Sequence, residues 1–173
     1  MGVTNTGTLQ AQSGLVKISA KAASDVVESV INLGGVVDAD PFGKDTNAGK
    51  VVVSSTVGDI DVVANIKASS NLSNSAGGKV EITSTKGVDV HSNSVIKANG
   101  GAGAGKEGSI KITGKKVVFR GYAESLIRNL YDGPALIINQ TGPGALHIHN
   151  ISNEAAITGD TGVIYESSLE NIL

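Results

Sequence analysis

A short strand pattern that opens with glycine returns five times along this chain. In each copy, apolar residues occupy alternate positions after the glycine and polar residues lie between them. The copies are GLVKIS from Gly14, GKVVVS from Gly49, GKVEIT from Gly78, GSIKIT from Gly108 and GALHIH from Gly144. Successive glycines are 35, 29, 30 and 36 residues apart. Repetition at this interval is typical of a solenoid, in which stacked rungs bury a core that no single repeat could bury.

Two further apolar segments recur in phase with the glycine pattern. One series begins at Asp25, Asp59, Gly87 and Lys116, and the other at Gly7, Gly35, Asn65 and Val95. Three segments per repeat predict a three-sided coil, and parallel crossovers favour the right hand. We therefore expect an all-β fold: a single-stranded right-handed parallel β-helix with about five rungs of roughly 30 residues and three short strands per rung.

Strand periodicity predicts which side chains enter the coil. Alternate residues of a strand point to opposite faces, so we expect the aliphatic residues of each glycine pattern to stack into inward columns. These residues are Val16 and Ile18, Val51 and Val53, Val80 and Ile82, and Ile110 and Ile112. By the same rule Lys17, Glu81 and Lys111 should face solvent.

Length and composition favour one elongated domain. The chain has 173 residues, only 3% of them aromatic, and 23 glycines, which suits a narrow aliphatic core with many turns that need left-handed or tight backbone geometry. We expect a single β-helix domain over 1–173. Within it, 5–118 would form regular rungs, 119–143 an irregular insertion, and 144–173 the last rung and a C-terminal cap that includes a short helix in IYESSLENIL.

Charge and cysteine content exclude several classes of protein. The net charge is −2 without a basic stripe, which argues against nucleic acid as a partner. The absence of cysteine removes disulfides and thiolate metal sites. The sequence carries no transmembrane stretch, and its first residues lack the basic and apolar regions of a signal peptide. We expect the chain to be a segment of something longer.

The run from Thr6 to Asp40, TGTLQAQSGLVKISAKAASDVVESVINLGGVVDAD, resembles the filamentous haemagglutinin family of large bacterial exoproteins of the two-partner secretion route. The similarity covers roughly residues 5–114 and fades from Phe119 onward. It implies a β-helix segment without the family's secretion domain, located extracellularly or on the outer-membrane surface of a Gram-negative cell.

The resemblance implies a non-enzymatic adhesin or haemagglutinin-like scaffold. Its implied partners are a glycan or protein on a host or neighbouring cell, and the outer-membrane transporter of the parent exoprotein. Terminal rungs with open strand edges also favour self-association. Two alternatives stay open: a carbohydrate-active β-helix enzyme, and a purely structural spacer.

Irregular segments of solenoids often carry binding residues. We therefore name Tyr122, Arg128, Tyr131, His147 and His149, from the irregular stretch and the fifth glycine pattern, as candidate ligand contacts. His147 and His149 alternate around Ile148 and should share one strand face. Because zinc normally needs a third or fourth protein ligand, a polar outer face is the favoured interpretation, and no metal site is predicted.

Two aspartate carboxylates support the alternative of a carbohydrate-active enzyme. Asp61 and Asp89 occupy equivalent places in successive repeats, so their backbones should lie about one strand spacing, ~4.8 Å, apart. Paired carboxylates could perform acid and base chemistry on a sugar. No aromatic platform accompanies them in these repeats, so a solvated strand face is favoured and no catalytic residue is assigned.

Two remaining motifs, a glycine-rich run and a set of Asn-x-Ser/Thr triplets, are not interpreted as functional sites. Gly100 to Lys106 fit half of a phosphate-binding loop, but Glu107 replaces the required Ser or Thr and a strand pattern follows instead of a helix. We therefore expect no nucleotide and no other cofactor. Asn-x-Ser/Thr triplets occur at Asn71, Asn139 and Asn150, all expected on turns. Glycosylation at them is left open.

Overall fold

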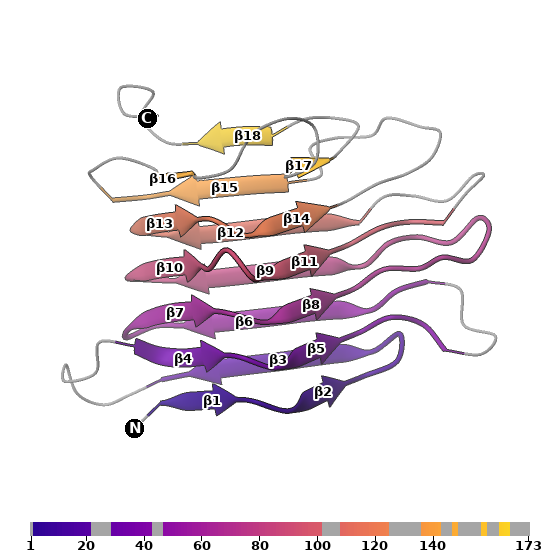
Figure 1. Cartoon of the computed structure of the whole chain (residues 1–173), viewed down its shortest axis with the longest axis horizontal. Coiled ribbons are helices and arrows are strands. Elements are labelled where there is room, and N and C mark those ends of the chain that lie inside the picture. Colours follow the sequence, from indigo (N-terminus) through magenta and orange to yellow (C-terminus); the bar gives the residue numbers. More distant parts are fainter. Residues whose placement is uncertain are drawn as a thin grey trace.

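The computed structural model describes residues 2–21, 29–42, 47–101, 108–124, 136–142, 147–148, 157–158 and 163–166. The described residues form three six-stranded parallel sheets, which we call sheets A, B and C, and successive strands visit the three sheets in turn (Figure 1). The chain is therefore a parallel β-solenoid with three strands per rung, as predicted. None of the described segments is a helix of the length and apolar character that a membrane crossing requires.

The strands of each sheet recur every third element. Sheet A contains β1 (Val3–Asn5), β4 (Ser29–Leu33), β7 (Asp59–Val62), β10 (Gly87–Val90), β13 (Lys116–Phe119) and β16 (His147–Ile148). Sheet B contains β2 (Thr8–Gln10), β5 (Val36–Asp38), β8 (Asn65–Lys67), β11 (Val95–Lys97), β14 (Tyr122–Glu124) and β17 (Ile157–Thr158). Sheet C contains β3 (Leu15–Ala20), β6 (Lys50–Ser55), β9 (Lys79–Ser84), β12 (Ser109–Gly114), β15 (Leu136–Gln140) and β18 (Val163–Glu166).

The predicted inward columns are confirmed. In sheet C, Val16 is paired in register with Val51, Val51 with Val80, and Val80 with Ile110. From Val51 onward, the inward residues of these strands are almost completely buried, and alternate residues are more exposed. Each apolar side chain thus stacks on its counterpart in the next rung, which gives one continuous aliphatic core.

The fifth glycine pattern does not occupy the sheet that we predicted. We expected GALHIH from Gly144 to follow β12 in sheet C, but His147 pairs with Val118 of β13 in sheet A. The strand that pairs with β12 is β15, through Ile110 to Leu136 and Ile112 to Ile138. Alternation predicts a strand, but it does not say which of the three sheets the strand joins.

This placement also corrects the predicted irregular insertion. Residues 119–143 contain two ladder strands, β14 and β15, which continue sheets B and C.

Two smaller corrections follow from strand boundaries. The first rung's segment predicted from Asp25 lies mostly outside the described residues, and the strand there is β4, which begins at Ser29. Residues 164–166, the start of the predicted capping helix, belong instead to strand β18 (Val163–Glu166).

The glycines that open the patterns are needed for close backbone approach. A Cβ on Gly78 would lie 1.9 Å from the carbonyl oxygen of Gly49, and one on Gly108 would lie 2.2 Å from that of Gly78. Left-handed backbone, which we expected of glycine, asparagine and serine in the turns, occurs at Ser13 and Asn74, with φ of 52° and 61°. Glycine therefore recurs here because stacked turns leave no room for a side chain.

Buried hydroxyls complete the corner between sheets C and A. Ser55 and Ser84 are register partners at the ends of β6 and β9, and both are buried. The Ser84 hydroxyl donates to the Gly58 carbonyl oxygen and accepts from the Lys86 amide, each at 2.9 Å. These bonds satisfy the backbone groups that leave the ladder at the turn.

Candidate functional site

The outer face of sheet A holds a cluster of ionisable side chains from three successive rungs. Asp61 in β7 and Asp89 in β10 are direct register partners, as the repeat spacing predicted. Both carboxylates are about one-third exposed, with side-chain exposures of 31% and 32%. Because like charges directly opposite each other in a sheet destabilise it, this pair needs neighbouring positive charge.

A tight turn after β10 brings His91 to these carboxylates. The His91 amide donates to the Val62 carbonyl oxygen at 2.9 Å, which extends the ladder by one residue. The Ser94 amide then closes the turn onto the His91 carbonyl oxygen at 2.9 Å, and the Ser94 hydroxyl donates to the same Val62 oxygen at 2.5 Å. The turn therefore fixes the backbone from which the imidazole projects.

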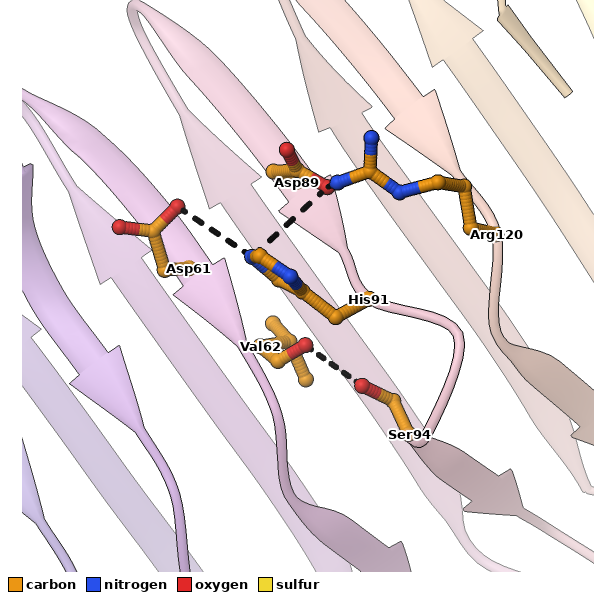
Figure 2. Close-up of polar contacts among 6 residues, drawn as sticks. All are labelled: Asp61, Val62, Asp89, His91, Ser94 and Arg120. Atoms are coloured by element: carbon orange, nitrogen blue, oxygen red, sulfur yellow. Dashed lines mark hydrogen bonds and ion pairs between the residues drawn. The ribbon is translucent and has the colours of Figure 1, made fainter. Parts of the chain in front are cut away.

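The imidazole of His91 lies between the two carboxylates (Figure 2). Its Nε2 is 4.0 Å from Oδ1 of Asp61 and 4.0 Å from Oδ1 of Asp89. Both distances exceed the range of a direct hydrogen bond. One ligand atom from each of the three residues lies within 4.8 Å of the others, so nitrogen and oxygen ligands converge on one point.

Arg120 joins the cluster from the following rung. Its amide continues the ladder by donating to the Val90 carbonyl oxygen at 2.8 Å. Its guanidinium Nη2 donates to Oδ1 of Asp89 at 2.5 Å, the same oxygen that faces the imidazole (Figure 2). Arg120 therefore offsets part of the repulsion between the paired aspartates.

A shallow depression of ≈ 140 Å³ adjoins the cluster on the same face. Its lining includes the paired Asp61 and Asp89. Asp59 adds a further negative charge and Lys116 adds a positive charge. The full set is Asp59, Asp61, Gly87, Val88, Asp89, Lys116 and Val118. Asp59 is held in place because its Oδ1 accepts from the Gly87 amide at 2.6 Å.

A second polar cluster lies on sheet B and contains one predicted ligand contact, Tyr122. Its hydroxyl and the Asn99 side-chain amide both donate to the Glu124 carboxylate. Lys97 lies 3.5 Å from that carboxylate and 5.7 Å from the centre of the Tyr122 ring. Partial burial raises the pKa of Glu124, but the bonds from Tyr122 and Asn99 and the charge of Lys97 outweigh it, so the net pKa is lowered.

The other predicted contacts are not brought together in the described structure. Arg128, Tyr131 and His149 lie outside the described residues, and His147 is placed by its backbone alone, in β16. Of the three glycosylation triplets, Asn139 lies within strand β15, contrary to the expected turn, and Asn150 lies outside the described residues. The glycine-rich run from Gly100 leads into strand β12, as predicted.

Sequence reasoning found the two aspartates but missed their partners. His91 lies two residues after Asp89, and this spacing places both on one face of an extended segment. That signal was present in the sequence. Arg120 could not be found in this way, because its contact with Asp89 crosses to the next rung and depends on side-chain direction.

Comparisons with protein-family models, curated proteins and solved structures find no match to this chain. The fold defines a parallel β-solenoid with three sheets. Among the residues that the structure describes, the aspartate, histidine and arginine cluster on sheet A is the candidate site.

Proposed function

We propose that this protein is a non-enzymatic scaffold segment of a filamentous haemagglutinin-like adhesin, exposed on or secreted from a Gram-negative cell. The observation that carries the proposal is the contrast between the two faces of the strands. In sheet C the two inward columns that start at Val16 and Ile18 stay aliphatic, whereas one register-paired outward column runs Lys17, Val52, Glu81, Lys111 and Ile137. A constant core with a varied exterior suits a rod that displays contact residues.

The shape of the described surface also supports contact over a broad face. The depression beside Asp61 and Asp89 measures ≈ 140 Å³, whereas small-molecule pockets usually occupy about 300–1,000 Å³. A glycan or a protein on a host or neighbouring cell would therefore bind along the ladder, and the transporter of the parent exoprotein would be a further partner.

Self-association belongs to the same proposal. In the described structure β3 is an edge strand of sheet C, and its inward residue Val16 keeps 8% exposure where Val51 has none. An uncovered strand edge offers backbone groups and apolar side chains to another strand.

The test is binding of the folded chain to glycan arrays and epithelial cells, with one variant set for each sheet. Glu81→Gln with Lys111→Gln alters sheet C, Lys67→Gln with Asp38→Asn alters sheet B, and Asp61→Asn with Asp89→Asn alters sheet A. Saturable binding that one set abolishes and the others retain would support an adhesin and locate its surface. A folded chain that binds nothing would favour the spacer.

The cluster on sheet A keeps a carbohydrate-active enzyme as a second candidate. Two carboxylates and an imidazole beside a depression are the groups that acid and base catalysis uses. Turnover of a polysaccharide by the wild-type chain, lost in Asp61→Asn and in Asp89→Asn, would replace the adhesin proposal with this one.

A further inference from the structure

We propose that Asp61, Asp89 and His91 form a binding site for a divalent transition-metal ion, with Zn²⁺ as the matching ion, that bridges two rungs on the outer face of sheet A. The inference is independent of the adhesin proposal, because it depends only on the chemistry of these side chains. It also replaces our sequence-based expectation that the chain has no metal site.

The donor set selects the kind of ion. Two carboxylate oxygens and one imidazole nitrogen suit Zn²⁺ and its neighbours in the first transition series, whereas Ca²⁺ and Mg²⁺ prefer oxygen ligands throughout. Catalytic and exchangeable zinc sites commonly have three protein ligands and one position open to water. The three side chains are 31–39% exposed, so the fourth position would face solvent.

The distances fit an ion at the centre of the cluster. The imidazole is 4.0 Å from each carboxylate, and the three ligand atoms are within 4.8 Å of one another. An ion in the plane of these three atoms and equidistant from them lies about 2.5 Å or less from each. Movements of a few tenths of an ångström would shorten these distances to the 2.0–2.2 Å of zinc ligands.

The backbone positions of all three ligand residues are fixed by the fold. Asp61 and Asp89 lie on adjacent ladder strands in exact register. The backbone of His91 is held by the turn that Ser94 closes onto Val62 (Figure 2). Little order must be gained on binding, and the ion would relieve the repulsion between two carboxylates that the ladder forces together.

The positive charge of Arg120 weakens metal binding at this cluster. Its guanidinium lies 2.5 Å from Oδ1 of Asp89, the oxygen that faces His91. The ion and the guanidinium therefore compete for one oxygen, and each repels the other's charge. Removal of this arginine charge should strengthen metal binding.

The test is calorimetric titration of the folded full chain with zinc chloride, and with calcium and magnesium chloride as comparisons. We expect one Zn²⁺ bound at this cluster and no comparable binding of Ca²⁺ or Mg²⁺. His91→Gln, Asp61→Asn and Asp89→Asn should each weaken this binding by about tenfold or more, and Arg120→Gln should strengthen it. Glu81→Gln is the matched control, because it removes a carboxylate of 39% exposure from another sheet.

The two remaining histidines need their own control. His147→Gln with His149→Gln should leave the cluster's Zn²⁺ binding intact, and the His91 imidazole resonances in an NMR spectrum should shift with one equivalent of zinc. Zinc binding that survives His91→Gln, or that disappears only in the His147 and His149 variant, would overturn the proposal. Equal affinity for Ca²⁺ would also overturn it, since that would indicate diffuse attraction to acidic side chains.

Discussion

At the scale of single residues, the partly buried carboxylate of Asp40 is a place where charge opposes folding. Its Oδ1 accepts from the Ser69 amide at 2.6 Å. Burial raises the pKa of Asp40 above its ordinary value of 3.8, although the Ser69 bond acts in the opposite direction. The native state therefore favours protonation more strongly than the unfolded state does, so the cost of the carboxylate is present above the native pKa and fades as the pH falls through it.

Asp40→Asn should consequently match or exceed the wild type in stability at pH 7, because an amide oxygen keeps the bond to Ser69 without the charge. Asp40→Ala loses the acceptor and should cost about 1 kcal/mol. Urea unfolding at pH 7 and pH 4 measures both, and the advantage of the asparagine variant should shrink at the lower pH. Equal losses in the two variants at pH 7 would contradict this account.

Glu124 should show the opposite pH dependence. Its pKa is lowered below its ordinary value of 4.5 because the bonds from Tyr122 and Asn99 and the charge of Lys97 outweigh the effect of burial. Its contribution to stability is therefore complete above pH 4.5 and is lost as the pH falls through the native pKa. Tyr122→Phe removes one of these bonds and keeps the ring beside Lys97. The variant should be modestly less stable than wild type at pH 7, and the two unfolding curves should converge once the pH is below the native pKa of Glu124.

At the scale of elements, the stacked glycines make a sharp prediction. Gly78→Ala places a methyl group 1.9 Å from the Gly49 carbonyl oxygen, so the turns must separate, and we expect a loss of about 1–3 kcal/mol. Gly7→Ala is the matched control, because nothing lies within 4 Å of a Cβ at that position. Thermal and urea unfolding of both variants provide the measurement. A Gly78 variant as stable as the Gly7 variant would mean that the turns yield easily.

The elements also show how far sequence reasoning extends. Inward and outward faces were predicted correctly, because strand alternation acts within a few residues of sequence. Assignment to a sheet failed for the pattern that starts at Gly144, because its strand belongs to sheet A. The strand that continues sheet C is β15, which has no glycine directly before it. At the site, repeat spacing paired Asp61 with Asp89. Alternation could also have placed His91, two residues after Asp89, on the same face. The contact of Arg120 depends on a long side chain from the next rung, so spacing could not supply it.

At the scale of the whole molecule, the solenoid behaves as a stack in which each rung contacts only its neighbours. Lys50 and Lys79 are register partners, as are Ile60 and Val88, and Val37 and Ile66. Deletion of residues 50–78 would therefore join Gly49 to Lys79 and place β9 beside β3, with every inward residue still inward. We expect a folded chain with unchanged β-signal per residue in circular dichroism and a lower free energy of unfolding, since one core layer is gone.

Deletion of one residue more, 50–79, is the matched control. It places Val80 opposite Leu15 and Glu81 opposite Val16, so a carboxylate enters the core while Val80 and Ile82 face solvent. A one-residue slip exchanges the two faces of a strand, and this variant should be far less stable or unfolded. The shorter deletion also tests the metal site, because Asn32, the register partner of Asp61, would then lie beside Asp89. With an amide in place of the first carboxylate, the folded variant should lose zinc binding at the cluster, which would show that the site depends on which rungs are neighbours.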